Sequence, residues 1–306
     1  MGVLVACKGM TPLSGQIEDY PDGIILPVDK PWRWTSADVI RKIKFAAGRH
    51  FHKKNLKVGH AGTLDPLATG VLLVCIGKAT KLAEELQRHD KEYVAGLCFG
   101  ATTPSYDLEK EIDRFYPWDH IDEAAVRAVL PGFLGEQEQV APLFSAKSVD
   151  GVRAYELARK RYREALREGT GFDHALTDLL SRQRIRIDAI ELLSFTPGTA
   201  PAGLRPDVQT DSSLPGGEQT DHMSEKADRE RNAGNRIHVT DNSALGLPRA
   251  DIRVACTKGT YIRALARDLG EAVGSGAHLD ALRRTRSGGF RVEDALTVEE
   301  ALRILQ

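Results

Sequence analysis

The sequence is short of the features that mark several classes of protein. It has only four cysteines, Cys7, Cys75, Cys98 and Cys256, which are far apart and form no C-x-x-C pair. A disulfide framework or a cysteine-based metal site is therefore not expected. The chain has no run of eighteen apolar residues, so no membrane-spanning helix is predicted. Its first residues include no positively charged leader, so we expect a cytoplasmic protein that does not bind membranes.

A strong net charge is also absent. The chain carries 42 Lys and Arg against 43 Asp and Glu, and a net charge of −1 does not by itself indicate a nucleic-acid binder. Basic residues nevertheless gather in segments 52–57, 159–163 and 283–291. Such local clusters matter more than the total charge for contact with phosphates, although each one taken alone is more typical of an ordinary solvated surface.

The rest of the sequence shows the apolar patterns of strands and helices. Strands are expected at 23–28, 71–76, 93–99, 185–193 and 250–256. Helices are expected from a cap at Thr35 or Ser36, at 79–88, 121–130 and 153–167, from Gly259, and at 277–284 and 298–305. No strict βαβ rhythm links them, so we predict an α+β fold with a largely antiparallel sheet. Residues 196–235, acidic and rich in Pro and Gly, are predicted to form a flexible insertion.

The segment 59–70, GHAGTLDPLATG, is the strongest candidate for a functional loop. It places Asp65 among glycines and directly before a proline, while Leu64 and Leu67 can anchor the loop. Such a loop can hold a carboxylate rigidly in a cleft. A plain Asp-Pro surface turn is the commoner interpretation of this spacing alone. A phosphate-binding loop is a third interpretation, but the glycine spacing matches no phosphate-binding motif.

The full segment closely resembles the aspartate motif of the TruB family, the bacterial tRNA pseudouridine-55 synthases. Four other segments resemble further blocks of that family in the same order: GIILPVDKPWRWTS, DKEYVAGLCFGATTPSYDLE, APLFSAKSVDGVRAYELAR and CTKGTYIRALARDLGEAVGSGAHLDALRRTRSG. The resemblance spans residues 23–195 and 250–297. It implies the pseudouridine synthase fold, a central and mostly antiparallel mixed sheet flanked by helices and loops. It also implies an isomerase that converts uridine 55 in the T loop of tRNA to pseudouridine after base flipping.

The resemblance implies three catalytic residues. Asp65 matches the essential aspartate, which could attack C1′, attack the base or deprotonate C2′ of the ribose. Arg263 matches an arginine that would orient this carboxylate and favour its ionised form. Tyr93 matches an active-site tyrosine expected to stack on the target base. Without the resemblance, an ordinary helix arginine and a core tyrosine would be the preferred interpretations.

The resemblance also implies residues that contact the substrate or support the site. His60 matches a histidine that lies against the RNA and helps displace the loop base, Asp107 an aspartate near the active site, and Leu282 an apolar residue of the uracil pocket. The block around Lys147 departs from the family, because a frequent lysine is replaced by Ser148 and Lys147 precedes it, so a phosphate contact there is in doubt. Structural roles near the catalytic loop are expected for Lys30, Pro31 and Gly62.

The implied reaction involves no redox step, so no organic cofactor and no metal are expected. The expected partner is the T stem-loop of tRNA, bound by a monomer without an obligatory protein partner. We expect an N-terminal extension over 1–22, one catalytic domain over 23–297 that includes the insertion, and a C-terminal helix over 298–306. Too few residues follow the last block for the PUA domain that many relatives carry, so the catalytic domain alone should bind tRNA.

Two other functions are compatible with the sequence. One is a pseudouridine synthase that acts on another RNA, as the dyskerin-type relatives do. The other is a tRNA-binding or tRNA-folding protein in which catalysis is secondary. The presence of Asp65, Tyr93 and Arg263 favours an active enzyme but does not exclude an additional folding role.

Overall fold

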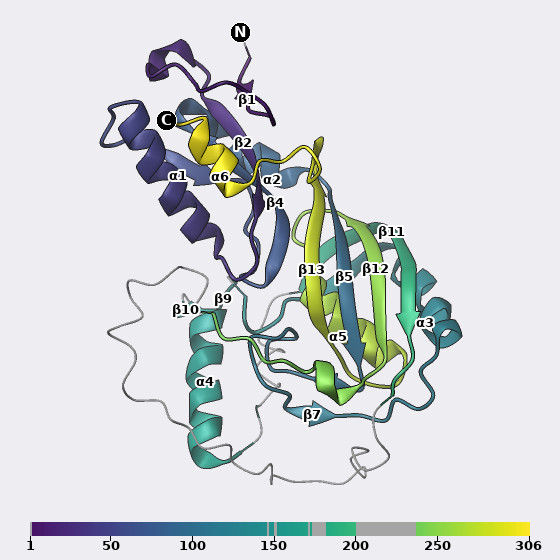
Figure 1. Ribbon diagram of the computed structural model, residues 1–306. Coiled ribbons are helices and arrows are strands. Elements are labelled where there is room, and N and C mark those ends of the chain that lie inside the picture. Colours follow the sequence, from purple (N-terminus) through teal and green to yellow (C-terminus); the bar gives the residue numbers. More distant parts are fainter. Residues whose placement is uncertain (1, 146, 150–151, 171, 173–181, 200–236) are drawn as a thin grey trace.

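The computed structural model describes residues 2–145, 147–149, 152–170, 172, 182–199 and 237–306 (Figure 1). The predicted flexible insertion lies outside the described residues from position 200 onward. Within the described part of the chain, no helix is long and apolar enough to cross a membrane.

A ten-stranded mixed sheet forms the centre of the described structure. Its main path runs β1-β2-β4-β13-β5-β12-β11-β8, with β3 added to β4 and β14 to β13. The pairings are antiparallel except β1 with β2 and β13 with β4. The strands are β1 (Leu4–Val5), β2 (Ile24–Lys30), β3 (Val58–His60), β4 (Ala68–Ile76), β5 (Lys91–Phe99), β8 (Gly135–Val140), β11 (Arg182–Thr196), β12 (Arg249–Cys256), β13 (Ala277–Ser287) and β14 (Phe290–Arg291). The predicted α+β class with a mostly antiparallel mixed sheet is confirmed.

Helices and two short hairpins surround the sheet. In Figure 1, α5 lies against the sheet while α1 and α4 stand to one side of it. The helices are α1 (Ser36–His50), α2 (Ala83–Arg88), α3 (Glu123–Val129), α4 (Ala154–Glu168), α5 (Ile262–Ala272) and α6 (Val298–Arg303), and the hairpin strands are β6 (Ala101–Thr102), β7 (Arg114–Phe115), β9 (Ser148–Val149) and β10 (Val152–Arg153). Short 3-10 helices occupy Ile17–Asp19, Gly77–Leu82, Leu130–Phe133 and Ser243–Leu245.

Helix α1 forms where local sequence signals predict it. Thr35 is the N-cap and makes a capping box with Asp38, in which each side chain bonds the other residue's backbone N–H. Val39, Ile43 and Ala47 recur at helical spacing and are fully buried against the sheet. The cap and the buried stripe together fix where α1 begins and which face it turns outward.

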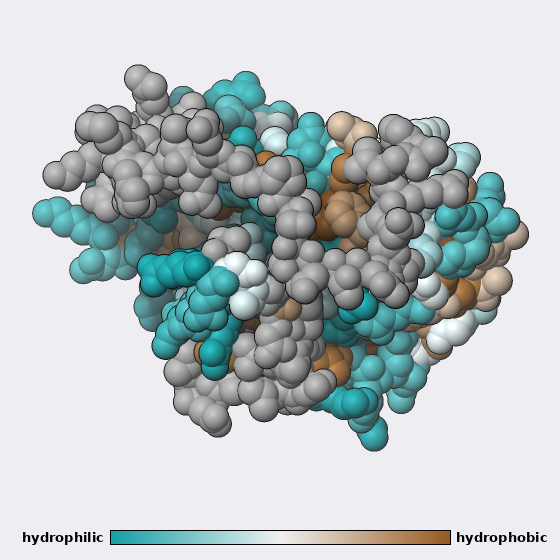
Figure 2. Space-filling view, turned by 90° about the horizontal axis from the view of Figure 1, so that it is seen from below, coloured by the Kyte–Doolittle hydropathy of each residue, from teal (hydrophilic) through white to brown (hydrophobic). Residues whose placement is uncertain are grey.

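One main hydrophobic core lies between the sheet and its helices. The apolar side of β5 contributes Ala95, Leu97 and Phe99, and α5 contributes Leu265 and Leu269. All five side chains are at most 1% exposed. The surface of the molecule seen from below in Figure 2 is mostly hydrophilic where it is coloured, with smaller hydrophobic areas between. Burial on this scale gives the sheet a rigid centre on which a site can be built.

The predicted helix at 277–284 is wrong, because these residues belong to strand β13. Leu279 and Leu282 are three residues apart, which is typical of a helix. In the structure β13 pairs with β5 on one side and with β4 on the other, and its register against β5 shifts between Leu279 and Ala281. A bulge adds one residue and changes which side chains face the core. The spacing of three therefore comes from an irregular strand.

Gly70 allows β4 and β13 to approach each other closely. Its φ of +104° is left-handed, and a Cβ placed there would lie 2.1 Å from the carbonyl oxygen of Arg284. We expect Gly70→Ala to lower the free energy of unfolding by at least about 2 kcal/mol, because neither the backbone angle nor the space suits a side chain. Urea denaturation measures the change. Gly59→Ala is the control, since no heavy atom lies within 4 Å of its added Cβ; an equal loss in both variants would contradict the argument.

Candidate active site

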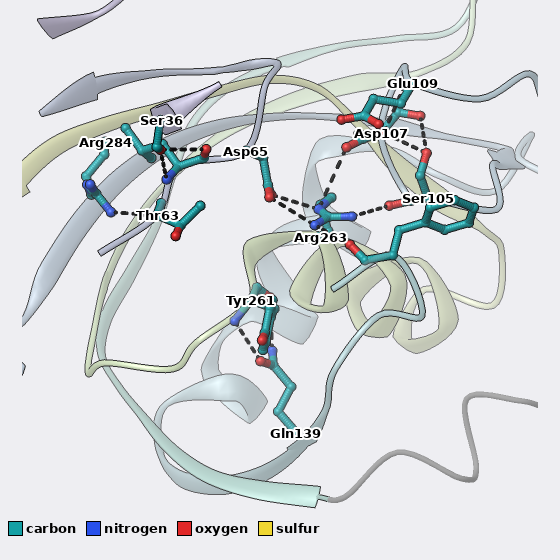
Figure 3. Close-up of polar contacts among 12 residues, drawn as sticks. Ser36, Thr63, Asp65, Ser105, Asp107, Glu109, Gln139, Tyr261, Arg263 and Arg284 are labelled. Carbon is teal, nitrogen blue, oxygen red and sulfur yellow. Dashed lines mark hydrogen bonds and ion pairs between the residues drawn. The ribbon is translucent and has the colours of Figure 1, made fainter. Parts of the chain in front are cut away.

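The loop between β3 and β4 carries Asp65 and is held by the start of α1. The Ser36 hydroxyl accepts a hydrogen bond from the backbone N–H of Leu64 at 2.9 Å and donates to its carbonyl oxygen at 3.1 Å (Figure 3). Ser36 is 3% exposed. Because both backbone groups of Leu64 are bound to a buried side chain, the residue next to Asp65 has little freedom to move.

Two buried cations bind the carbonyl oxygens of the same loop. Arg284, on β13, donates to Gly62 at 3.2 Å and to Thr63 at 3.4 Å. The Lys30 ammonium donates to the carbonyl of Pro66 at 3.2 Å. Lys30 is fully buried, and burial lowers the pKa of its ammonium to about 8, although nearby Asp65 opposes the shift. The loop is thus tied to the sheet on both sides of Asp65.

Arg263 binds the Asp65 carboxylate with two parallel hydrogen bonds. Its Nε lies 2.8 Å from Oδ2 and its second terminal nitrogen 3.0 Å from Oδ1. The guanidinium also donates to the carbonyl oxygens of Ser105 at 3.1 Å and Phe144 at 3.0 Å. The Arg263 side chain is 6% exposed and that of Asp65 is 34% exposed. The arginine is therefore fixed by four acceptors, while the carboxylate it orients stays accessible.

Two further carboxylates lie behind this pair. Asp107 has one oxygen 3.7 Å from Arg263 Nε, and its other oxygen accepts from the Ser105 hydroxyl at 2.6 Å and from the Glu109 N–H at 2.9 Å. Burial raises the pKa of Asp107, although Arg263 opposes the shift. Burial, followed by repulsion from Asp107, raises the pKa of Glu109 to about 7. In contrast, Arg263 has a raised pKa despite its burial, because carboxylates surround it.

The raised pKa of Glu109 predicts a pH-dependent stability. Between its ordinary value of 4.5 and about 7 the folded protein binds a proton that the unfolded chain has lost. Stability should therefore fall as pH rises through this window. Asp107, Asp65, Arg263 and Lys110 are the charged groups that act on Glu109. We expect Glu109→Gln, which keeps a neutral side chain, to gain about 2 kcal/mol of unfolding free energy relative to wild type between pH 5 and pH 8.

Urea denaturation across this pH range measures the difference. The control is Glu111→Gln, which alters an exposed carboxylate on the same segment and should follow the wild-type curve. A Glu109→Gln curve parallel to wild type from pH 5 to pH 8 would contradict the prediction.

A cavity of about 830 Å³ opens in front of Asp65. Tyr93 and Leu282 line it from neighbouring strands β5 and β13, where Tyr93 lies opposite Arg284. Burial raises the pKa of the Tyr93 phenol, and the Arg284 guanidinium beside it opposes the shift. Basic and aromatic side chains complete the wall, among them Lys91, Arg159, Arg184, Lys258 and Tyr261. The cavity therefore combines an accessible carboxylate, an aromatic ring and positive charge.

The structure brings together most of the residues selected from the sequence. Asp65, Tyr93, Arg263 and Leu282 line the cavity, and Asp107 lies directly behind Arg263. Lys30 and Gly62 hold or form the loop that carries Asp65, and the carbonyl of Pro31 accepts a hydrogen bond from the Lys30 ammonium.

His60 and Lys147, which were selected as RNA contacts, do not line the cavity. His60 is half-buried at the end of β3, and burial followed by repulsion from Arg284 lowers the pKa of its imidazole. Its Nδ1 has no hydrogen-bond partner among the described residues. Lys147 is half-buried before α4, where its carbonyl accepts from the N–H of Ala154 at 2.7 Å. The predicted RNA contacts of both residues stay predictions.

Sequence reasoning missed several residues that shape the site. Ser36 was noted only as a helix cap, Arg284 only as part of a basic cluster, and Glu109 not at all as a functional group. Their contacts join segments far apart in the chain: 28 residues separate Ser36 from Leu64, and 222 separate Arg284 from Gly62. A buried arginine that binds only carbonyl oxygens leaves no periodic signal in a sequence.

Comparison with known proteins assigns the chain to one class of enzyme. The solved structure of a Cbf5–Nop10–Gar1 complex matches with a TM-score of 0.52 and 23% identity, covering 98% of this chain and 65% of that chain, a likeness that concerns the fold alone. The family model for the TruB family pseudouridylate synthase N-terminal domain matches residues 49–172, and that for the tRNA pseudouridylate synthase B C-terminal domain matches residues 263–306. The class is that of the pseudouridylate synthases.

Curated relatives narrow the assignment from the class of pseudouridylate synthases to one family. A protein of Phocaeicola vulgatus is 44% identical over 281 residues, covering 92% of each chain, and one of Flavobacterium johnsoniae is 38% identical over 297 residues, covering 96% of this chain and all of the relative. Both are named tRNA pseudouridine synthase B. The chain belongs to the TruB family, which confirms the resemblance seen in its sequence and the fold it implied.

Proposed function

We propose that this protein is a tRNA pseudouridine synthase that isomerises uridine 55 in the T loop to pseudouridine, with Asp65 as its catalytic residue. The observation that carries the proposal is the Asp65 carboxylate, accessible in a large cavity and bound by two hydrogen bonds to a buried Arg263. Family membership and the names of the relatives support tRNA as the substrate.

The reaction requires an ionised and well-positioned carboxylate. The N1–C1′ bond breaks, the base turns, C5 bonds to C1′, and the proton on C5 is lost while N1 gains one, so no electrons are exchanged with another molecule. Asp65 acts either as a nucleophile on the ribose or base or as the base that removes the C2′ proton. Arg263 fixes the direction of the Asp65 carboxylate, since its fork meets both carboxylate oxygens.

The cavity wall suits a base that has left its stack. Tyr93 offers an aromatic ring for stacking, and Leu282 offers an apolar contact beside it. Extruding a base costs a few kcal/mol, which contacts inside the cavity must offset. We propose that His60 occupies the place of the flipped base, and that Asp107 acts on the reaction only by positioning Arg263.

We expect electrostatic attraction between basic side chains and tRNA phosphates to supply the rest of the binding free energy. Arg159, Arg184 and Lys258 line the cavity from three different elements and can contact phosphates. The affinity for tRNA should therefore fall steeply as salt concentration rises. We assign Lys147 a phosphate contact at the base of α4 as part of the same proposal.

A site-mapped pseudouridine assay on unmodified tRNA transcript tests the function. The purified protein alone should modify uridine 55 and no other position, and a transcript with cytidine at position 55 is the matched control. If the protein modifies ribosomal RNA but not tRNA, the substrate is ribosomal RNA and the proposed one is wrong. Activity that appears only after a protein partner is added would contradict the proposal that the chain acts alone.

A further inference from the structure

The outer surface of α1 carries exposed aromatic side chains close to the catalytic loop. Phe45 is 68% exposed and Trp32 is 50% exposed. They are the only aromatic residues among the large exposed hydrophobic side chains of the described chain. Aromatic side chains are enriched where proteins bind their partners. We call the surface formed by Trp32, Trp34, Lys42, Phe45 and Arg49 the α1 face.

Each aromatic ring of the α1 face lies under a cation. The guanidinium of Arg33 is 5.5 Å from the centre of the Trp32 ring, the Lys42 ammonium 5.3 Å from Trp34, and the guanidinium of Arg49 5.7 Å from Phe45. Lys42, Phe45 and Arg49 follow one another at helical spacing, so they share one stripe of α1. Long cationic side chains can cover aromatic rings simply to shield them from water, and the experiment below separates that role from binding.

The exposed charged side chains of α1 are all positive. The exposed positions of the whole helix include Arg41, Lys42, Lys44 and Arg49, and its single acid, Asp38, is 11% exposed and paired with Arg41 at 2.7 Å. Lys42, Lys44 and Arg49 form no ion pair with a described carboxylate. By contrast, two exposed cations near the far edge of the sheet are paired, Arg127 with Glu123 and Arg253 with Glu191. The exposed charges of α1 are therefore all positive, on a chain whose total charge is nearly zero.

The position of α1 connects this surface to the active site. The Lys30 ammonium bridges the carbonyls of Trp34 at 2.5 Å and Pro66 at 3.2 Å, so the base of the α1 face lies beside the loop that carries Asp65. From there the helix runs for fifteen residues, about 22 Å at the usual rise. Figure 1 shows α1 and α4 on the same side of strands β13, β5 and β12.

The turn before α1 is held in an unfavourable conformation. Arg33 has a φ of +62°, a value that is uncommon for residues other than glycine. Its guanidinium donates to the carbonyl of Ile237 at 2.8 Å while lying over Trp32. Strained residues of this kind are concentrated at functional sites. Here the strained backbone presents Trp32 to solvent.

We propose that the α1 face is a second RNA-binding surface, which receives the phosphate backbone of the stem adjoining the loop whose base enters the cavity, with Trp32 and Phe45 packing on exposed ribose or base. The inference rests on the proposed function. Unpaired cations interleaved with aromatic rings match the chemistry of RNA, where cations meet phosphates and rings stack. The exposed side chains of α1 include four cations and no acid, which favours a polyanion over a protein partner.

Neutralising the α1 face tests the inference. The double variant Lys42→Gln/Arg49→Gln should weaken binding of tRNA transcript about tenfold at 0.1 M salt, and should lower the slope of log affinity against log salt by about 2, as expected for two lost phosphate contacts. The loss should appear in KM more than in kcat. Phe45→Ala, which removes a ring but no charge, should weaken binding about threefold with an unchanged salt slope.

The matched control is Arg127→Gln/Arg253→Gln, which removes the same charge from exposed positions near the far edge of the sheet. Fluorescence anisotropy with labelled transcript measures binding whether or not the RNA is modified, so a failure of the proposed reaction is seen separately in the pseudouridine assay. Equal affinities and salt slopes for the α1 double variant and the control would overturn the inference, and the cations would then only shield the rings.

Discussion

Asp65→Asn is expected to abolish pseudouridine formation while leaving the fold and tRNA binding intact. Asparagine has nearly the same shape and can still accept a hydrogen bond from Arg263, but it has no negative charge and is neither a nucleophile nor a base. Loss of such a group typically lowers kcat by a factor on the order of 10⁴ or more. The site-mapped assay under single-turnover conditions measures the rate, and fluorescence anisotropy measures tRNA affinity.

The matched control for this variant is Asp22→Asn, which makes the same chemical change at an exposed position before β2. It should keep the wild-type rate. If Asp65→Asn modifies tRNA within tenfold of the wild-type rate, Asp65 is not the catalytic residue. If Asp65→Asn is inactive but also fails to bind tRNA, the carboxylate is needed for binding or for structure. The assignment of a chemical role to Asp65 then loses its support.

Arg263→Lys is expected to lower kcat/KM by about 10²-fold to 10³-fold. The lysine keeps the charge but cannot meet both oxygens of Asp65 and the carbonyls of Ser105 and Phe144 at once. A carboxylate whose direction is no longer fixed loses much of the benefit of positioning. Arg263→Met should also lower the free energy of unfolding by about 3 to 5 kcal/mol, because it removes the cation beside the buried carboxylate of Asp107.

Steady-state kinetics and urea denaturation measure the two effects. Arg267→Lys is the matched control, one turn further along α5, where the guanidinium pairs with neighbouring Asp268 at 2.7 Å. It should change kcat/KM by less than threefold. An Arg263→Lys enzyme with wild-type kcat/KM would show that the two parallel hydrogen bonds do not contribute to catalysis.

Local signals in the sequence were sufficient for much of the fold. The cap of α1 was predicted because Thr35 and Asp38 are three residues apart and satisfy each other's backbone. The strands β2, β5 and β12 were predicted because their apolar patterns follow from burial in the sheet. Strand β13 was predicted wrongly, because its pairing with β4 and β5 joins residues far apart in the chain and a bulge disturbs its alternation.

By itself the sequence determined the family and the candidate residues Asp65, Tyr93 and Arg263, since contiguous motifs carry them. It also determined the α+β class, since the apolar patterns of the strands and helices are local. Only the tertiary structure decided how the candidate residues meet. It brought Arg263 onto a carboxylate 198 positions away, buried Asp107 beside it and placed Glu109 in the cavity wall. Burial, distance and pKa depend on contacts between remote segments, and no contiguous stretch of residues contains that information.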